Sequence, residues 1–381
     1  MYKFAFKNLW LKKTRSGLAL LGLAVAIIGV IGLISISGGI RESVTESVAK
    51  VQGIYVIKED SLDPVFSTLP LSYEDDLEKI QGVKAVAPEI WGIITTVEGE
   101  TTLTQGMMSA VMYIGIEPSK TLKLTDGGVY NQNMKKGRFL RSSDKYSAVI
   151  SQELADEYKK GVGSSIELID ETKFTIVGIY ETGTTFLDMA IIIPMDVARD
   201  FADMDSDHVS SFYVDVDNPA QVEAVAAKIQ FKLDDIDAKS GSQAAEEFSS
   251  LIAQIDVFFV IISSIAIIVG GLGILNMMLM SVMERTREFG ILKAIGWTRS
   301  NIMQLIVFES LFIGIVGGAI GCILGLAGVL ALEPFLPFSP APTLLLVAAA
   351  FLLAVTLSVL GGLYPAWKAS KLDPVTAIRA I

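Results

Sequence analysis

Four long apolar stretches constrain this chain more than any other feature. They run from Gly17 to Ile36, from Val257 to Met283, from Ile302 to Leu332 and from Thr343 to Leu363. A helix of about 20 apolar residues is long enough to cross the hydrocarbon core of a bilayer. The whole chain is 51% hydrophobic, and its mean hydropathy is +0.51. Because backbone in lipid must satisfy its own hydrogen bonds, we predict four transmembrane helices.

The distribution of basic residues predicts the orientation of the chain. The two terminal segments and the segment between the second and third stretches together carry 12 Lys/Arg and three Asp/Glu, whereas the segment from Arg41 to Ser250 carries 19 Lys/Arg and 36 Asp/Glu. Short segments rich in basic residues stay in the cytoplasm. We therefore expect a multi-pass protein of the cell (inner) membrane with both termini cytoplasmic. A cleaved signal peptide is the alternative reading of the first stretch, but the stretch is longer than a signal-peptide apolar region.

These observations predict the fold class and the domain boundaries. We expect an integral membrane protein with four transmembrane α-helices and a large α+β extracytoplasmic domain of two subdomains between the first and second spans. In chain order, the predicted segments are a cytoplasmic amphipathic helix (1–16), the first span (17–40), the extracytoplasmic domain (41–250), a stalk with the second span (251–283), a cytoplasmic coupling helix (284–300), the third span (301–332), an extracytoplasmic loop (333–342), the fourth span (343–364) and a cytoplasmic tail (365–381).

Within the domain 41–250, alternating apolar residues predict short strands. We expect them at 54–58, 93–97, 111–116, 147–150, 165–168, 173–179, 190–193 and 212–216, with helices at 72–80, 152–160 and 219–233. The membrane-proximal subdomain is predicted to cover about 41–106 and 208–250, and an inserted β-rich subdomain about 107–207. Apolar residues from Phe248 to Phe259 share one helical face that continues into the second span, so we predict a stiff stalk helix there.

The segment from Met283 to Ile302 is the only long polar interruption in the last third of the chain. It contains Phe289, Leu292 and Ile295 at i, i+3 and i+6, which predicts a short amphipathic helix with one apolar edge. Gly296 is expected to end this helix in the left-handed conformation. Such an edge favours docking of a partner, and a helix lying on lipid headgroups is the alternative. The residues predicted for this contact are Glu284, Arg285, Arg287, Glu288, Phe289, Leu292, Lys293, Ile295 and Gly296.

Two further sets of residues point to the membrane. Phe6, Trp10, Lys12 and Lys13 recur at helical spacing, which is typical of an interfacial helix with rings at headgroup level and lysines facing phosphates; the helix could anchor the chain or dock a partner. The third span also contains closely spaced glycines that permit close packing of helices, either within one subunit or between two. These glycines are Gly314, Gly317, Gly318, Gly321 and Gly325.

Glu309 is an acidic residue inside the third apolar stretch. A carboxylate at this depth is costly and usually has a partner. A proton or ion relay would need several such groups, so we favour a packing or hydrogen-bonding role near the cytoplasmic interface. The spans also lack the polar lining of a hydrophilic transport path.

Several kinds of chemistry are not supported by the sequence. No phosphate-binding G-x-x-x-x-G-K-[ST] motif occurs, so we expect no enzymatic activity and no cofactor in this chain. Asp203, Asp205 and Asp207 alternate like an EF-hand, but His208 stands where that loop needs glycine, so no metal site is predicted. The acidic composition argues against nucleic acid as a partner.

Three blocks of sequence resemble the permease subunits of MacB/FtsX-type ABC transporters. Ala5 to Ser16 (AFKNLWLKKTRS) resembles the basic N-terminal helix of that family, Glu284 to Trp297 (ERTREFGILKAIGW) its coupling segment, and Leu363 to Ile381 its C-terminal tail. The stretch from Gly137 to Tyr158, with FTIVGIYE further on, resembles the family's periplasmic core domain more loosely.

The resemblance implies a permease driven by mechanotransmission. The expected partners are a separate ABC ATPase subunit that binds ATP and Mg, a second permease subunit in a homodimer or heterodimer, membrane lipid and an extracytoplasmic adaptor. The expected substrate of export or extraction is apolar or amphipathic: a drug, peptide, lipid or lipoprotein. The alternatives are a signalling permease that regulates an extracytoplasmic protein such as a hydrolase, and a membrane-anchored domain with no ATPase.

Overall fold

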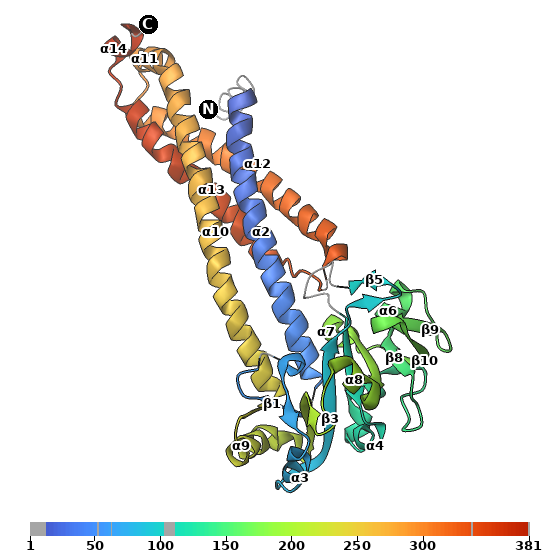
Figure 1. Ribbon diagram of the computed structural model, residues 1–381. Coiled ribbons are helices and arrows are strands. Elements are labelled where there is room, and N and C mark those ends of the chain that lie inside the picture. The colour runs from blue at the N-terminus through green and yellow to red at the C-terminus, as the bar shows by residue number, and fades with distance from the viewer. Residues whose placement is uncertain (1–12, 52, 62, 103–110, 337, 380–381) are drawn as a thin grey trace. The chain divides into compact units, whose positions relative to one another are not determined.

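The computed structural model describes residues 13–51, 53–61, 63–102, 111–336 and 338–379. The chain divides into two compact units. One, which we call the membrane unit, comprises Met1–Ile40 and Leu251–Ile381, and the other, which we call the sheet domain, is Arg41–Ser250. Two helices continue from one unit into the other, α2 (Lys13–Ala49) and α10 (Gly241–Glu284) (Figure 1).

Among the described residues, four helices are long and apolar enough to cross a membrane: Ala19–Ser47 within α2, α10, Arg299–Phe335 and Leu344–Ser370. The four predicted spans are therefore confirmed. The remaining elements of the membrane unit are α11 (Thr286–Ala294), α12 (Arg299–Leu332), η7 (Glu333–Phe335), α13 (Leu344–Ser370) and α14 (Pro374–Arg379). The helix α13 continues through Pro365, so the first residues of the expected tail are helical.

The glycines of α12 pack inside the chain. A Cβ added at Gly321 would lie 2.8 Å from the Cβ of Ile27 in α2, and Gly317 and Gly325 also face α2. Gly314 and Gly318 instead face α13, where a Cβ added at Gly318 would lie 2.9 Å from the Cβ of Ala354. The two sets of glycines therefore allow α2 and α13 to approach α12 from two sides.

The sheet domain is built on one mixed sheet. Among the described residues it has ten strands, in the order β14-β1-β13-β3-β6-β11-β8-β10-β7, with β9 paired to β10. The strands are β1 (Ile54–Lys58), β3 (Val83–Ile93), β6 (Met112–Ile116), β7 (Met134–Gly137), β8 (Ser147–Ser151), β9 (Ser165–Leu168), β10 (Thr172–Tyr180), β11 (Ala190–Pro194), β13 (Ser211–Val216) and β14 (Ile236–Ser240). The pairs β6–β11 and β8–β10 are parallel, and the other pairs are antiparallel.

Both faces of the sheet carry a core because side chains alternate along each strand. Ile54, Ile90 and Phe212 belong to the larger cluster, which includes residues of four helices. Ile114 and Ile192 belong to a second cluster on the opposite face. The helices of the domain are α3 (Tyr73–Glu78), α4 (Pro118–Thr121), α5 (Gly128–Gln132), α6 (Gln152–Glu157), α7 (Thr185–Asp188), α8 (Met195–Ala202) and α9 (Val222–Lys232).

Short elements complete the domain. They are the ladders of β2 (Leu69–Pro70) with β12 (His208–Val209) and β4 (Thr96–Val97) with β5 (Glu100–Thr101), and the 3-10 turns η1 (Pro64–Phe66), η4 (Thr125–Gly127), η5 (Ile169–Glu171) and η6 (Pro219–Gln221).

The two expected subdomains are joined by the sheet. Strands β14, β1, β13 and β3 come from the segments assigned to the membrane-proximal subdomain, and β6, β11, β8, β10 and β7 come from the inserted segment. The β3–β6 pair connects them, with Glu89 opposite Ile116 and Ile93 opposite Met112. The larger cluster also contains residues of both segments. The subdomains are thus two halves of one layered domain, since their strands share hydrogen bonds and a core.

Candidate functional site

The polar segment between α10 and α12 folds as the short helix α11, and local chemistry sets both of its ends. Arg285 leaves the helical conformation (φ −102°, ψ 13°), which separates α11 from α10. Gly296 has φ +104°, as expected for a residue that ends a helix in the left-handed region. The side chain of Thr298 accepts a hydrogen bond from the backbone N–H of Asn301 (3.2 Å) and caps α12. The chain therefore reverses direction over few residues.

Arg285 joins this segment to the third span. Its Nη1 donates to both carboxylate oxygens of Glu309 in α12, at 3.1 and 3.2 Å, and its Nε donates to Glu288 Oε2 at 3.0 Å. The side chain of Arg285 is 12% exposed and that of Glu309 is 7% exposed. The guanidinium carbon also lies 5.2 Å from the ring centroid of Phe289. Arg285 was predicted to contact an ATPase, but in this structure it is engaged inside the chain.

The apolar edge predicted for docking is divided by the fold. Phe289 is fully buried in the core of the membrane unit, and Leu292 is half-buried against the same core. Only Ile295, at 70% exposed, faces solvent. The expectation that Phe289 is offered to a partner is thus wrong, because this chain's own spans cover that side of α11.

Lys293 fixes the other end of α11. Its Nζ donates to the backbone carbonyls of Ser370 (2.7 Å) and Leu372 (2.6 Å), at the end of α13. A lysine at this position satisfies carbonyls that have no partner within the helix. Burial lowers the pKa of Lys293, and the charge of Arg299 lowers it further. Lys293 was also predicted to contact an ATPase, and it too is engaged inside the chain.

A different set of residues forms the exposed side of α11. Arg287, Ile291 and Ile295 recur at i, i+4 and i+8, which places them on one face of the helix. Ile291 is 47% exposed and Ile295 is 70% exposed, and Arg287 and Arg299 are exposed as well. We call Arg287, Ile291, Ile295 and Arg299 the docking edge. Ile291 is not among the residues predicted for the partner contact, although its spacing from Ile295 places both on one face of the helix.

The remaining predicted residues lie elsewhere. Glu284 and Glu288 are exposed at the start of the segment. Phe6, Trp10 and Lys12 lie outside the described residues, and Lys13 begins α2. The helix α10 is one unbroken element from Gly241 to Glu284, as expected for a stalk continuous with the second span.

One group of potential metal ligands occurs among the described residues. Ligand atoms of Asp205, Asp207 and His208 lie within 4.8 Å of one another in an exposed loop. His208 Nδ1 lies 2.8 Å from Asp207 Oδ1, and the guanidinium of Arg199 donates to the backbone carbonyls of Asp205 and His208. These contacts give the loop a structural explanation that needs no metal.

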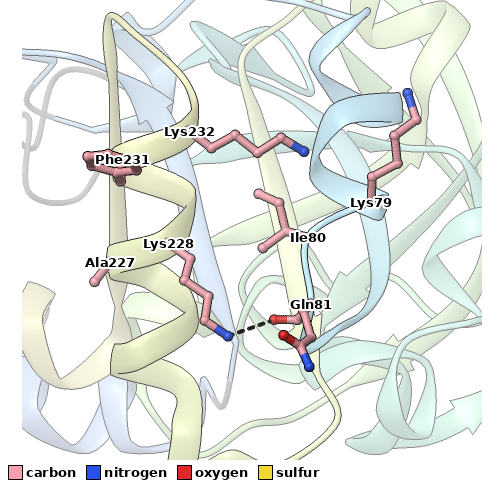
Figure 2. A pocket seen from close by; sticks show the side chains of 7 residues that line it. All are labelled: Lys79, Ile80, Gln81, Ala227, Lys228, Phe231 and Lys232. Carbon is pink, nitrogen blue, oxygen red and sulfur yellow. Dashed lines mark hydrogen bonds between the residues drawn. The ribbon is translucent and has the colours of Figure 1, made fainter.

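A shallow basic groove lies on the sheet domain. It has a volume of about 740 Å³ and is lined by Lys79, Ile80, Gln81, Ala227, Lys228, Phe231 and Lys232 (Figure 2). Lys228 Nζ donates to the backbone carbonyl of Gln81 at 3.1 Å, and Lys232 Nζ to that of Asp76 at 3.0 Å. Phe231 is 94% exposed. The lysine stems therefore bridge α9 and the end of α3.

Four apolar helices, a large domain inserted after the first of them and a short helix between the second and third are the features of a multi-pass membrane protein. Two family models match the chain: the MacB-like periplasmic core domain over residues 16–231 and the FtsX-like permease C-terminal region over residues 260–374. The chain belongs to this family, the MacB/FtsX-type ABC transporter permeases.

Individual relatives agree with this assignment. The chain is 28% identical to an ABC transporter permease of Methanocaldococcus jannaschii, over 99% of this chain and 96% of that protein. It is 26% identical to the macrolide export ATP-binding/permease protein MacB of Bdellovibrio bacteriovorus (98% of this chain) and 25% identical to the pyoverdine export ATP-binding/permease protein PvdT of Pseudomonas savastanoi (99% of this chain). It spans 60% and 58% of the lengths of these two proteins.

Proposed function

We propose that this chain is the permease subunit through which a separate ATPase, binding ATP and Mg, drives conformational change in the sheet domain. The work done would be export or extraction of an apolar or amphipathic substrate. The observation that carries the proposal is the division of α11 into two sides. One side is fixed to the chain's own spans by Arg285, Phe289 and Lys293, and the opposite side presents Ile291 and Ile295. Force applied to the exposed side of α11 would be transmitted to the spans through the fixed side.

The composition of the spans supports force transmission rather than a pore. Among the four apolar stretches, only the third contains a charged residue, Glu309, and Arg285 engages it. A hydrophilic path would need several polar groups along its length. The unbroken α10 offers a stiff connection between α11 and the sheet domain. We place both termini and α11 in the cytoplasm and the sheet domain outside, on the distribution of basic residues.

The partners and substrate follow from the same reasoning. Leu251, Ile255 and Phe258 of α10 are 53%, 44% and 65% exposed, so this apolar face is open to lipid or to a second permease subunit. Two relatives are named for macrolide export and for pyoverdine export. We therefore expect an amphipathic substrate and a dimeric permease, with an adaptor as a further partner of the sheet domain.

The docking edge gives the direct test. Each ABC ATPase of the source organism would be co-expressed with the tagged permease to find the one that copurifies with it. We expect Ile291→Asp and Ile295→Asp each to weaken copurification by about tenfold or more, because a buried apolar contact becomes a desolvated charge. Binding of the purified ATPase to permease in nanodiscs would be measured by biolayer interferometry.

A matched control separates docking from general damage. Phe231→Asp introduces the same charge at a residue that is 94% exposed in the sheet domain, and we expect it to leave ATPase binding unchanged. Full ATPase binding by Ile291→Asp and Ile295→Asp together would contradict the docking edge. To distinguish transport from signalling, hydrolysis by the assembled complex would be measured with a macrolide, with a siderophore and with neither.

A further inference from the structure

The contact between Arg285 and Glu309 lies at the junction of three helices. Arg285 is the single non-helical residue between α10 and α11, and Glu309 lies 24 residues later in α12. Both carboxylate oxygens of Glu309 accept from the same guanidinium nitrogen. Among the hydrogen bonds of the described residues, no other side chain donates to Glu309. The pair is therefore a specific connection between the start of the coupling helix and the third span.

The guanidinium is held from several directions. Glu288 accepts from Nε on the solvent side, and the Phe289 ring lies beneath the guanidinium carbon. A planar guanidinium offers donors in a fixed fork, so these contacts define its orientation as well as its position. Phe289 is itself fully buried in the core of the membrane unit. Rotation of α11 about its own axis would break the ion pair and expose this ring.

Stability alone does not explain a charged pair at this depth. Removing two charges from water is costly, and a buried pair is often no more stable than well-packed apolar residues of similar volume. The charged pair instead fixes the position of α11 on α12, because Arg285 and Glu309 satisfy each other only while the two helices hold them within hydrogen-bond distance. Polar groups inside helix assemblies commonly fix register in this way at a cost in stability.

We propose that Arg285 and Glu309 are positioning residues that fix the coupling helix to the third span. A displacement applied to the docking edge then moves α12 together with α10, rather than rotating α11 on its connection to α10. This inference rests on the proposed function, because it describes how the docking edge would be linked to the spans. It assigns Arg285 to transmission and not to ATPase binding.

The experiment compares three substitutions in the full-length permease in nanodiscs. Glu309→Leu removes the acceptor, and Glu309→Gln keeps an acceptor of the same shape. Glu333→Gln is the matched control, because that carboxylate is exposed just beyond the other end of α12. We expect Glu309→Leu to bind the ATPase within about twofold of the wild type but to lower permease-dependent stimulation of ATP hydrolysis by about tenfold. Glu309→Gln should retain most of the stimulation and Glu333→Gln nearly all of it.

A distance measurement tests the geometry independently of any ATPase. In a Cys322→Ala background, spin labels at Ala294 in α11 and Leu324 in α12 would report the distribution of distances between the two helices. We expect a narrow distribution in the wild type and in Glu309→Gln, and a broad one in Glu309→Leu. A merely structural role would lower thermal stability and ATPase binding without this selective broadening.

The results distinguish failure of the positioning role of Arg285 and Glu309 from failure of the proposed function. Unchanged distance distributions and undiminished stimulation in Glu309→Leu would overturn the positioning role. If no ATPase binds the wild type, the proposed function fails, while the spin-label distances still show whether the pair fixes α11 on α12. If Glu309→Leu does not insert into membranes, Arg285→Leu removes the donor of the same pair instead. Loss of stimulation with broadened distances in Arg285→Leu supports the role, and wild-type behaviour in both readouts overturns it.

Discussion

Glu89 makes the stability of the sheet domain depend on pH. This residue lies in β3 between β13 and β6, opposite Ser211 on one side, and is only 6% exposed. Its Oε2 accepts from Trp91 Nε1 at 2.7 Å. Burial raises the pKa of Glu89 from 4.5 to about 7, and the hydrogen bond from Trp91 opposes this rise in part. The folded domain therefore retains a proton that the unfolded chain releases at lower pH.

The sign and size of the effect follow from linkage. Because the pKa of Glu89 is higher in the folded state, its stabilising contribution is fully present below pH 4.5 and is lost as the pH rises through about 7. A difference of one unit between the folded and unfolded pKa corresponds to about 1.4 kcal/mol. Titration of this one carboxyl therefore lowers the free energy of unfolding by about 2.5 kcal/mol between pH 5 and pH 8. Glu89→Gln should remove that loss, because the amide does not titrate.

The assay uses the fluorescence of Trp91 during urea unfolding. The chain has four tryptophans, and replacing the other three by Phe leaves Trp91 as the only one. The free energy of unfolding would be compared at pH 5 and pH 8 for this background, for Glu89→Gln and for Glu78→Gln, which changes an exposed carboxylate in α3. Equal pH dependence in the background and in Glu89→Gln would refute the reasoning.

Three further substitutions, the first with a matched control, test helix packing, a helix cap and a buried hydroxyl without a partner. Gly321→Ala should cost about 1–3 kcal/mol through its contact with Ile27, measured by thermal unfolding in detergent, whereas Gly328→Ala, with nothing within 4 Å of the added Cβ, should cost far less. Thr298→Ala removes the cap of α12 and should cost about 1 kcal/mol in the same assay. The buried hydroxyl of Ser211 has no hydrogen-bond partner among the described residues, so Ser211→Ala should stabilise the sheet domain by about 1 kcal/mol in the fluorescence assay.

The sequence predicts the spans well because each is a long apolar segment whose helical state the bilayer dictates. It also predicts strands whose pattern is local: the expected strand at 165–168 coincides with β9. Expectation and structure differ at β3, which covers Val83–Ile93, whereas the predicted strand ran from 93 to 97. The sequence pattern does not predict this strand because it contains Pro88 and Glu89, and neither residue is typical of a central strand. Their places depend on pairing with β6 and with β13, and β13 lies more than 100 residues further along the chain.

The sequence pattern also predicts only part of the candidate site. Periodicity located the helix and its termination at Gly296, but α11 has more than one apolar edge, and the pattern does not say which edge the rest of the chain covers. Phe289 and Leu292 are covered by the spans, whereas Ile291 and Ile295 are exposed. The burial of a short helix is decided by tertiary contacts, which a local pattern does not contain.

Two basic residues, one at each end of α11, attach this helix to different spans, and their placement bears on the proposed mechanism. Arg285 holds the first turn of the helix to α12, and Lys293 holds the last turn to the carbonyls that end α13. With both ends fixed, α11 would have little freedom to pivot under the load that we propose for Ile291 and Ile295. The ends of α12 and α13 must then move with it, and α10 follows because it joins α11 through a single residue. A load on one short edge would thus reach three spans at once.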